Sequence, residues 1–378
     1  MKICIDIRCL AEGRRTGVEE YTRHLLHHLF AIDQKNEYVL FLNSWKKTKG
    51  NLSWLKKYPN VKVKKFNFPN KILNLMFWYL GWPKIDYLVG GADVVFSPNI
   101  IFGNVSARTK SVITIHDLSF FRHSEYFSRK RRWWHIFINP KKICQTANKI
   151  IVVSNSTKND LVGLYKIKPE KIIVIPSAVS NDFCVINRND EKLIKVKERY
   201  NLPYKFILFF GTIEPRKNIV GLIRAFNLLQ KQSGEYKLII AGEKGWMNEE
   251  INNEIINSPF REKIKIINCV PDEDKVYLYN LASLFVYPSF FEGFGFPPLE
   301  AMKCGVPVIV SNNSSLPEIV GDAGIIIDPD KPDEIFLAMK GILENSKLRN
   351  ILIKKGLEKS REFDWKKTAK KTLDVFLK

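Results

Sequence analysis

Short apolar runs alternate with amphipathic stretches along the whole chain. Buried parallel strands give near-continuous apolar runs, and the helices that connect them show a wider apolar spacing. This order therefore predicts an α/β protein with parallel sheets. The expected strands are 2–7, 37–42, 61–66, 93–96, 111–115, 149–153 and 171–175, followed by 206–210, 237–241, 265–269, 284–287, 306–310 and 325–327.

The strands fall into two series separated by a polar connection. Residues 176–204 are mixed and polar, with one short helix expected over 191–200. A chain of 378 residues suits two domains of ordinary size. We expect a first domain over residues 1–185 and a second over residues 200–360. Three helical stretches close the chain, at about 333–344, 347–362 and 365–377.

Residues 292–300, with the sequence EGFGFPPLE, follow an expected strand directly. Pro297 and Pro298 suit the first turn of a helix, where a missing N–H does no harm. The segment is therefore predicted to form strand, glycine loop and helix, and its backbone N–H groups would attract an anion. Glu292 and Glu300 flank this loop, where carboxylates can accept hydrogen bonds from the hydroxyls of a ribose or a sugar.

A second candidate loop follows the strand 206–210. It begins at Gly211, contains Arg216 and Lys217, and precedes a helix expected from residue 219. Arginine offers a forked donor and lysine a compact charge, which together suit a diphosphate. An Arg-Lys pair alone would usually be surface charge. Its place after a buried strand and before a helix favours the phosphate interpretation.

The first half offers weaker candidates. Gly17 lies in a polar loop with Gly13, Arg14 and Arg15, and residues 16–19 form a capping box that predicts a helix from about residue 18 to 30. Gly17 could allow a ligand close to the backbone, or could be a plain turn glycine. His116 and Asp117 end the strand 111–115, where α/β proteins bind ligands, but His116 could equally be satisfied by backbone. Ser156 is expected to cap a helix over residues 157–165.

The net charge of +21 is uneven. Residues 1–189 hold 31 Lys+Arg against 13 Asp+Glu, and residues 190–378 hold 29 against 26. The excess suggests a polyanionic or membrane-surface partner for the first half, unless it is simply a solvated basic surface. Segments 71–84 and 128–137 combine cations with Trp and Phe, which suits a membrane interface. The alternatives are a core-facing aromatic stripe with a wet basic edge and, less favoured, single-stranded nucleic acid.

Other features bound the cellular setting. No long uncharged apolar run is present, and the N-terminus lacks the apolar stretch of a signal peptide. The six cysteines are scattered without a C-x-x-C pair, so reduced thiols and no zinc site are expected. We therefore expect a cytoplasmic protein.

Together these motifs resemble the retaining GT-B glycosyltransferases of family 4, over essentially the whole chain. The segment 211–218 and the pair Glu292 and Glu300 carry most of the likeness; Gly17, His116-Asp117 and Val153-Ser154 carry less. The resemblance implies two Rossmann-like domains facing a central cleft, with the last helix, residues 361–378, crossing back to the first domain. The family is metal-independent and no D-x-D motif ends a strand here, so no metal is expected. No cofactor is expected either, because the nucleotide-diphospho-sugar is the donor substrate.

The resemblance also implies residue roles. Arg216 and Lys217 would hold the donor diphosphate and Glu300 the ribose, with Glu292 beside the donor sugar. The backbone around Phe294, Gly295 and Phe296 and the loop at Gly211 would lie nearby, and Gly17 and His116 would line the cleft. Glu292, His116, Lys217 and Arg216 are the candidate catalytic residues.

The Glu-Pro-Arg-Lys-Asn form resembles bacterial mannosyltransferases of O-antigen or capsule assembly. This favours GDP-mannose as donor and a lipid-linked glycan as acceptor, at the inner face of the membrane. Rhamnosyl- and glucosyltransferases that use dTDP- or UDP-sugars are the alternatives. A sugar-nucleotide epimerase or a phosphorylase of the same fold is less favoured, as is a non-catalytic membrane or nucleic-acid adaptor.

Overall fold

The computed structural model describes residues 1–11, 13, 16–46 and 48–378. Arg14 and Arg15 of the predicted polar loop lie outside this set. The chain divides into two compact units, the first formed by Met1–Ala178 together with Asp364–Lys378, and the second by Val179–Phe363. The N-terminal segment of the first unit ends at residue 178, whereas the predicted boundary was residue 185. The connection that follows, including α8 (Glu191–Arg199), packs with the second unit.

The first unit is built on a seven-stranded sheet in the order β3-β2-β1-β4-β5-β6-β7. Every pairing is parallel, as the apolar runs predicted. The order reverses between β1 and β4, which creates a switch point where the following loops diverge. The strands are β1 (Lys2–Asp6), β2 (Glu37–Asn43), β3 (Val61–Phe66), β4 (Val94–Ser97), β5 (Lys110–Ile115), β6 (Lys149–Val152) and β7 (Ile172–Val174).

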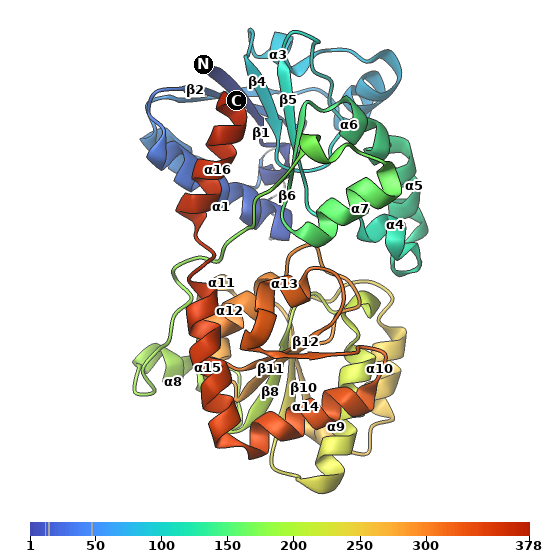
Figure 1. Ribbon diagram of the computed structural model, residues 1–378, viewed down its shortest axis with the longest axis vertical. Helices are drawn as coiled ribbons and strands as arrows, with labels where there is room; N and C mark the ends of the chain where they lie inside the picture. The colour runs from blue at the N-terminus through green and yellow to red at the C-terminus, as the bar shows by residue number, and fades with distance from the viewer. Residues whose placement is uncertain (12, 14–15, 47) are drawn as a thin grey trace. The chain divides into compact units, whose positions relative to one another are not determined.

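Helices flank this sheet on both sides, with α1 and α16 on one side in Figure 1 and α5, α6 and α7 on the other. The remaining helices are short. The bounds are α1 (Gly17–Ile32), α2 (Asn70–Leu75), α3 (Ile85–Leu88), α4 (Ser119–Arg122), α5 (Arg129–Ile138), α6 (Pro140–Thr146), α7 (Asn155–Tyr165) and α16 (Trp365–Leu377).

Two helix starts test the predicted caps. The Thr16 hydroxyl accepts a hydrogen bond from the Glu19 N–H at 3.3 Å, so α1 begins where the capping box placed it. The predicted cap Ser156 is wrong. Ser154 caps α7, accepting from the Thr157 N–H at 3.2 Å, because α7 begins two residues earlier than expected. Ser154 lies two residues after the end of β6 and has the extended backbone that a cap needs.

The last helix, α16, is part of the first unit although it is the end of the chain. It packs along α1. Trp365 stacks on His24 with ring centroids 5.5 Å apart, and Lys110 Nζ donates to the Val375 carbonyl at 2.7 Å. These contacts bring the C-terminal residues back to the sheet of the first unit.

The second unit has a six-stranded parallel sheet in the order β10-β9-β8-β11-β12-β13. The order reverses between β8 and β11, which are neighbours in the sheet although they are far apart in sequence. The strands are β8 (Phe206–Phe210), β9 (Lys237–Ala241), β10 (Ile264–Ile267), β11 (Leu284–Tyr287), β12 (Val308–Ser311) and β13 (Ile325–Ile327).

The helices of the second unit include α9 and α14, which pack on each other, and α12 and α15, which do the same. Each central strand is apolar and buried along its whole length, as Phe206–Phe210 and Leu284–Tyr287 show. No helix among the described residues is long and apolar enough to cross a membrane. The bounds are α9 (Ile219–Gln232), α10 (Glu249–Ile256), α11 (Asp272–Leu281), α12 (Phe296–Lys303), α13 (Leu316–Val320), α14 (Pro332–Glu344) and α15 (Ser346–Ser360).

Candidate active site

The two predicted motifs of the second unit meet at its switch point. One loop follows β8 and ends in a 3₁₀ turn, Pro215–Lys217, before α9 begins at Ile219. The other follows β11 and leads into α12. Because β8 and β11 are paired neighbours, their carboxyl ends place the two loops side by side, where open α/β sheets bind ligands.

Lys217 and Glu292 form the centre of this site. Lys217 Nζ donates to Glu292 Oε1 at 2.5 Å and to the Tyr287 hydroxyl at 2.7 Å. Both side chains are about nine-tenths buried. A lysine and a glutamate 75 positions apart in sequence are therefore joined directly, a contact that the sequence pattern did not reveal.

Arg216 extends this pair into a network. Its guanidinium lies 3.3 Å from Glu292 Oε1, donates to Glu214 Oε1 at 2.6 Å, and donates to the Phe291 carbonyl. Glu214 is 2% exposed. Two cations and two carboxylates thus share one buried cluster, as the cost of burying single charges requires.

Serine side chains fix the loop that carries Glu292. Ser289 Oγ donates to Glu292 Oε1 at 2.7 Å, and the Glu292 N–H donates to Ser314 Oγ at 2.8 Å. Ser315 Oγ contacts the carbonyl oxygens of Glu292 and Phe294 at 3.0 and 2.7 Å. The carboxylate is therefore held from its side chain and from its backbone, which limits its freedom to reorient.

The network sets the protonation of its members. Burial alone would raise the pKa of Glu292, but the charges of Lys217 and Arg216 outweigh it and lower this pKa to about 2. Burial and the neighbouring Arg216 charge lower the pKa of Lys217, while Glu292 acts in the opposite direction. Burial and the Glu292 charge raise the pKa of Tyr287, so its hydroxyl stays neutral. At neutral pH Glu292 is a carboxylate.

Gly295 and the two prolines shape the start of α12. Gly295 has φ +111°, and a Cβ there would lie 2.8 Å from Leu316 Cδ2, so both backbone conformation and space favour glycine. The helix begins at Phe296, with Pro297 next, as predicted. Phe294 is buried with its ring 5.1 Å from that of Phe296, so its side chain is part of the core.

Glu300 lies within α12 and is 3% exposed. Its Oε2 accepts a hydrogen bond from the Tyr279 hydroxyl at 2.7 Å. Tyr279, on α11, is fully buried, and burial together with the Glu300 charge raises its pKa, so it remains a donor. This fixed carboxylate is compatible with the predicted ribose contact, which stays a prediction.

Gly211 closes β8 by donating its N–H to the Ala241 carbonyl at 2.9 Å. A Cβ on Gly242 would lie 1.9 Å from the Gly211 carbonyl oxygen, so the two strand-end loops touch backbone to backbone. This close approach positions the loop that continues to Arg216.

Gly17 and His116 lie in the first unit, and the other eight predicted residues lie in the second. Gly17 is the first residue of α1, and a Cβ there would meet no other atom within 4 Å. Tyr21, one turn further along α1, packs edge-on against the His116 ring at a centroid distance of 4.7 Å. The N-terminal turn of α1 and the end of β5 are therefore neighbours in the first unit.

The ring of His116 is satisfied by backbone, the alternative weighed above. Its Nε2 lies 2.9 Å from the Pro98 carbonyl, which can only accept, so Nε2 carries the proton and Nδ1 holds a lone pair. Burial lowers its pKa, so the ring is neutral at pH 7. The Asp117 side chain accepts hydrogen bonds from the Ser119 N–H and hydroxyl.

Sequence reasoning missed the residues that support the site. No sequence motif marks Tyr287, Ser289 or Ser315. Glu214 lies within the segment 211–218, but no role was predicted for it. The signal available for Glu214 was its position three residues before Lys217 in a loop that also holds two cations.

Among the described residues no three His, Cys, Asp or Glu side chains are grouped to hold a metal ion. A cavity of about 420 Å³ in the first unit, lined by residues of α5 and by Tyr165, contains none of the predicted site residues.

Comparison with known proteins agrees with this architecture. Residues 15–183 match Glycosyltransferase Family 4, and residues 190–359 match Glycosyl transferases group 1. The chain is 36% identical over 271 residues to O-antigen chain mannosyltransferase B of Escherichia coli, covering 71% of this chain and 70% of that protein. It is 32% identical over 300 residues to serotype-specific mannosyltransferase WbdA of E. coli, covering 78% of this chain but 37% of that longer protein.

Among solved structures, sucrose-phosphate synthase from Thermosynechococcus elongatus superposes with a TM-score of 0.76 at 18% identity, covering 100% of this chain and 98% of that one. This likeness supports the fold. The chain has two Rossmann-like units with parallel sheets, and a charged network lies at the switch point of the second unit. Family matches cover both halves of the chain. The chain therefore belongs to glycosyltransferase family 4 and is a GT-B glycosyltransferase.

Proposed function

We propose that the protein transfers mannose from GDP-mannose to a hydroxyl of a growing, lipid-linked surface glycan, with retention at the anomeric carbon. The observation that carries the proposal is the buried network of Arg216, Lys217 and Glu292 at the second switch point. The choice of mannose rests on the two similar E. coli proteins, both of which are described as mannosyltransferases.

The network suits departure of a nucleoside diphosphate. Cleavage of the bond between the anomeric carbon and the phosphate oxygen leaves positive charge on the sugar ring and negative charge on the leaving group. Lys217 and Arg216, next to the N-terminus of α9, would stabilise that negative charge electrostatically. Their side chains are held in place by Glu292 and Glu214 before the reaction, so little reorganisation is needed.

The state of Glu292 bears on the route of transfer. Its Oε1 interacts with Lys217, Arg216 and Ser289, and such a carboxylate with a pKa near 2 is a weak nucleophile and a weak base. We therefore assign it an electrostatic role beside the sugar ring. The acceptor hydroxyl would attack from the face that the diphosphate leaves, and its proton would pass to a departing phosphate oxygen.

Nucleotide preference tests the donor. We expect GDP to raise the unfolding temperature more than UDP, dTDP or ADP, because at equal concentration the nucleotide with the lowest Kd stabilises the native state most. A ligand at one hundred times its Kd stabilises the native state by about 2.7 kcal/mol. Thermal unfolding with each nucleotide is the measurement, and Lys217→Ala is the matched control that should reduce the shift, because free GDP carries the negative charge of the leaving group. A larger shift with UDP or dTDP would replace GDP-mannose by a glucosyl or rhamnosyl donor.

The anomeric outcome tests the mechanism. With GDP-α-mannose as donor, we expect the product linkage to be α from the first turnovers, observed by ¹H NMR of the anomeric proton. A β linkage would require attack from the opposite face and a general base, and would overturn the same-face route. Absence of transfer from any nucleotide-sugar, with nucleotide binding intact, would favour the adaptor alternative.

A further inference from the structure

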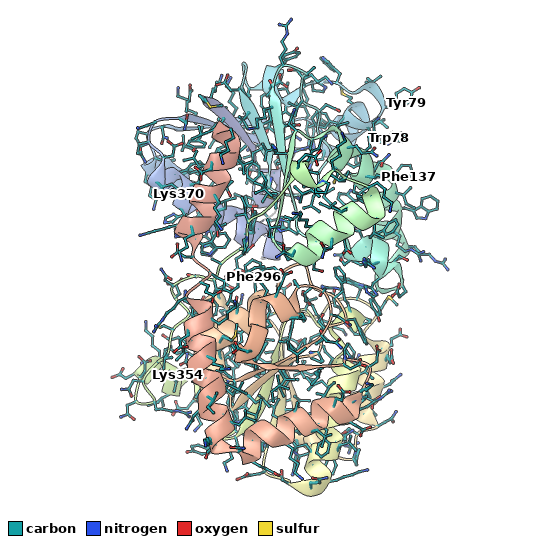
Figure 2. All side chains as sticks on the ribbon, in the orientation of Figure 1. Trp78, Tyr79, Phe137, Phe296, Lys354 and Lys370 are labelled. Carbon is teal, nitrogen blue, oxygen red and sulfur yellow. The ribbon has the colours of Figure 1, made fainter. Side chains whose placement is uncertain are left out.

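Two segments of the first unit that are far apart in sequence form one exposed apolar surface. One is α2 with the π-helical turn Met76–Leu80, and the other is α5. The rings of Trp78 and Phe137 meet edge to face at a centroid distance of 5.7 Å, and Figure 2 shows both at the outer edge of the unit beside Tyr79. We call this surface the aromatic patch; its exposed members are Trp78, Tyr79, Leu80, Trp82, Trp133, Ile136 and Phe137.

The patch is anchored to the body of the unit. Leu73 and Phe77 point inward and are 2% and 4% exposed, and both belong to a core cluster that includes Phe41. Trp78 and Tyr79, next along the chain, are 50% and 78% exposed. A core-facing aromatic stripe, one of the two main alternatives for this segment, is therefore wrong for these side chains. A large, fixed, solvent-exposed apolar surface marks an interaction site.

Cations flank the patch residues along the chain, and acids are absent from both segments. Residues 61–85 contain five Lys+Arg and no Asp or Glu, and residues 126–159 contain eight and none. The first four residues of α5, Arg129–Arg132, are all exposed cations. Charged guanidinium and ammonium groups at the edge of an apolar surface can contact lipid phosphates while the apolar groups enter the interface.

Division of the chain into units sharpens the charge asymmetry. The first unit, including α16, holds 35 Lys+Arg and 14 Asp+Glu, whereas the second holds 25 of each. The first unit therefore carries the whole net charge of +21, and the second is formally neutral. A negatively charged partner would be attracted to the unit that bears the aromatic patch.

We propose that the aromatic patch and the Arg129–Arg132 cluster bind the surface of an anionic lipid bilayer. The inference rests on the proposed function in one respect, because a lipid-linked acceptor would lie at such a surface. A second copy of the chain is disfavoured as occupant, since two facing patches would oppose four cations with four cations. Single-stranded nucleic acid shares the need for cations and aromatic rings, and is an outcome of the test.

Vesicle flotation tests the proposal with the full chain. We expect binding to phosphatidylcholine vesicles that contain about one-third phosphatidylglycerol, and roughly tenfold or more weaker binding to pure phosphatidylcholine, because the cations are attracted to the anionic lipid headgroups. Neutralising Arg129, Lys130, Arg131 and Arg132 to glutamine should remove most of the binding. The matched control neutralises four exposed lysines of α16 in the same unit: Lys366, Lys367, Lys370 and Lys371.

A second variant isolates the apolar contribution. Trp78→Ser with Phe137→Ser should weaken vesicle binding roughly tenfold and leave a residue of binding that is abolished by high salt, because only the electrostatic attraction remains. These side chains are half exposed, so the fold should be kept, which thermal unfolding checks. Equal binding by all variants, an equal loss in the α16 control, or tighter binding to a single-stranded oligonucleotide than to vesicles would overturn the proposal.

The assay requires neither donor nor acceptor, so it fails independently of the proposed function. Transfer to a water-soluble acceptor should be unchanged in the patch variants, whereas transfer to a lipid-embedded acceptor should fall. If vesicle binding holds and no sugar is transferred, the membrane surface stands and the mannosyltransferase assignment fails.

Discussion

We expect Lys217→Ala to lower kcat for sugar transfer by about 10²- to 10³-fold, because a preorganised hydrogen-bond donor to developing negative charge contributes a factor of that size to kcat. Its ammonium lies in the buried network at the switch point of the second unit. The effect should appear in kcat more than in KM, because the leaving diphosphate carries more negative charge in the transition state than in the bound donor. Steady-state kinetics with a soluble acceptor make the measurement.

The fold should tolerate this change. Arg216 and Ser289 still contact Glu292 when the Lys217 ammonium is removed, so the carboxylate is not left alone. Lys265→Ala is the matched control: its Nζ donates to the carbonyls of Tyr200 and Asn201, a structural role in the same unit. We expect this control to affect stability and leave turnover unchanged. Wild-type turnover in Lys217→Ala would show that the lysine only supports the loop.

Glu292→Gln should lower the free energy of unfolding of the second unit by about 3 kcal/mol at pH 7. The carboxyl has a pKa of about 2 in the folded chain against an ordinary 4.5, and each unit of difference corresponds to about 1.4 kcal/mol. Because the folded pKa is the lower one, this contribution is complete above about pH 4.5 and is lost as the pH falls through about 2. The difference between wild type and Glu292→Gln should therefore be flat at neutral pH and shrink in acid.

Urea unfolding at a series of pH values measures this difference. Glu254→Gln serves as the control, because Glu254 pairs with the half-exposed Arg224 and such pairs contribute about 1 kcal/mol or less. A Glu292→Gln difference that stays constant down to pH 2 would mean that the loss comes from packing and not from the ion pair. A difference no larger than that of the control would remove Glu292 from the stabilising network.

The fold could largely be predicted from local pattern. The strand over Phe206–Phe210 and the helix α16 over Trp365–Leu377 have the predicted bounds, because buried parallel strands and amphipathic helices have distinct apolar periods. The exception at α7 is instructive. Ser154 and Ser156 are both good capping residues, and local composition could not tell which one would have the extended backbone of a cap.

The candidate site was predicted in parts. Arg216, Lys217 and Glu292 were identified by their loops, but their mutual contact depends on the pairing of β8 with β11, which no local pattern encodes. Tyr287 could not be predicted for the same reason, since its partner Lys217 lies 70 positions away. Ser289 contacts Glu292 only because of the way the loop between them turns. The roles of Gly17, His116 and Glu300 toward a donor stay predictions.

The sequence by itself determined the alternation of strands and helices, the two charged loops and the basic character of the first half, because these depend on residue type and spacing. Only the tertiary structure decided which cation neutralises which carboxylate, which unit carries the net charge, and that Trp78 and Phe137 meet at the surface. Those outcomes depend on which distant segments pack together. The aromatic and basic residues of these segments do not by themselves show whether their side chains are buried in the core or exposed to solvent.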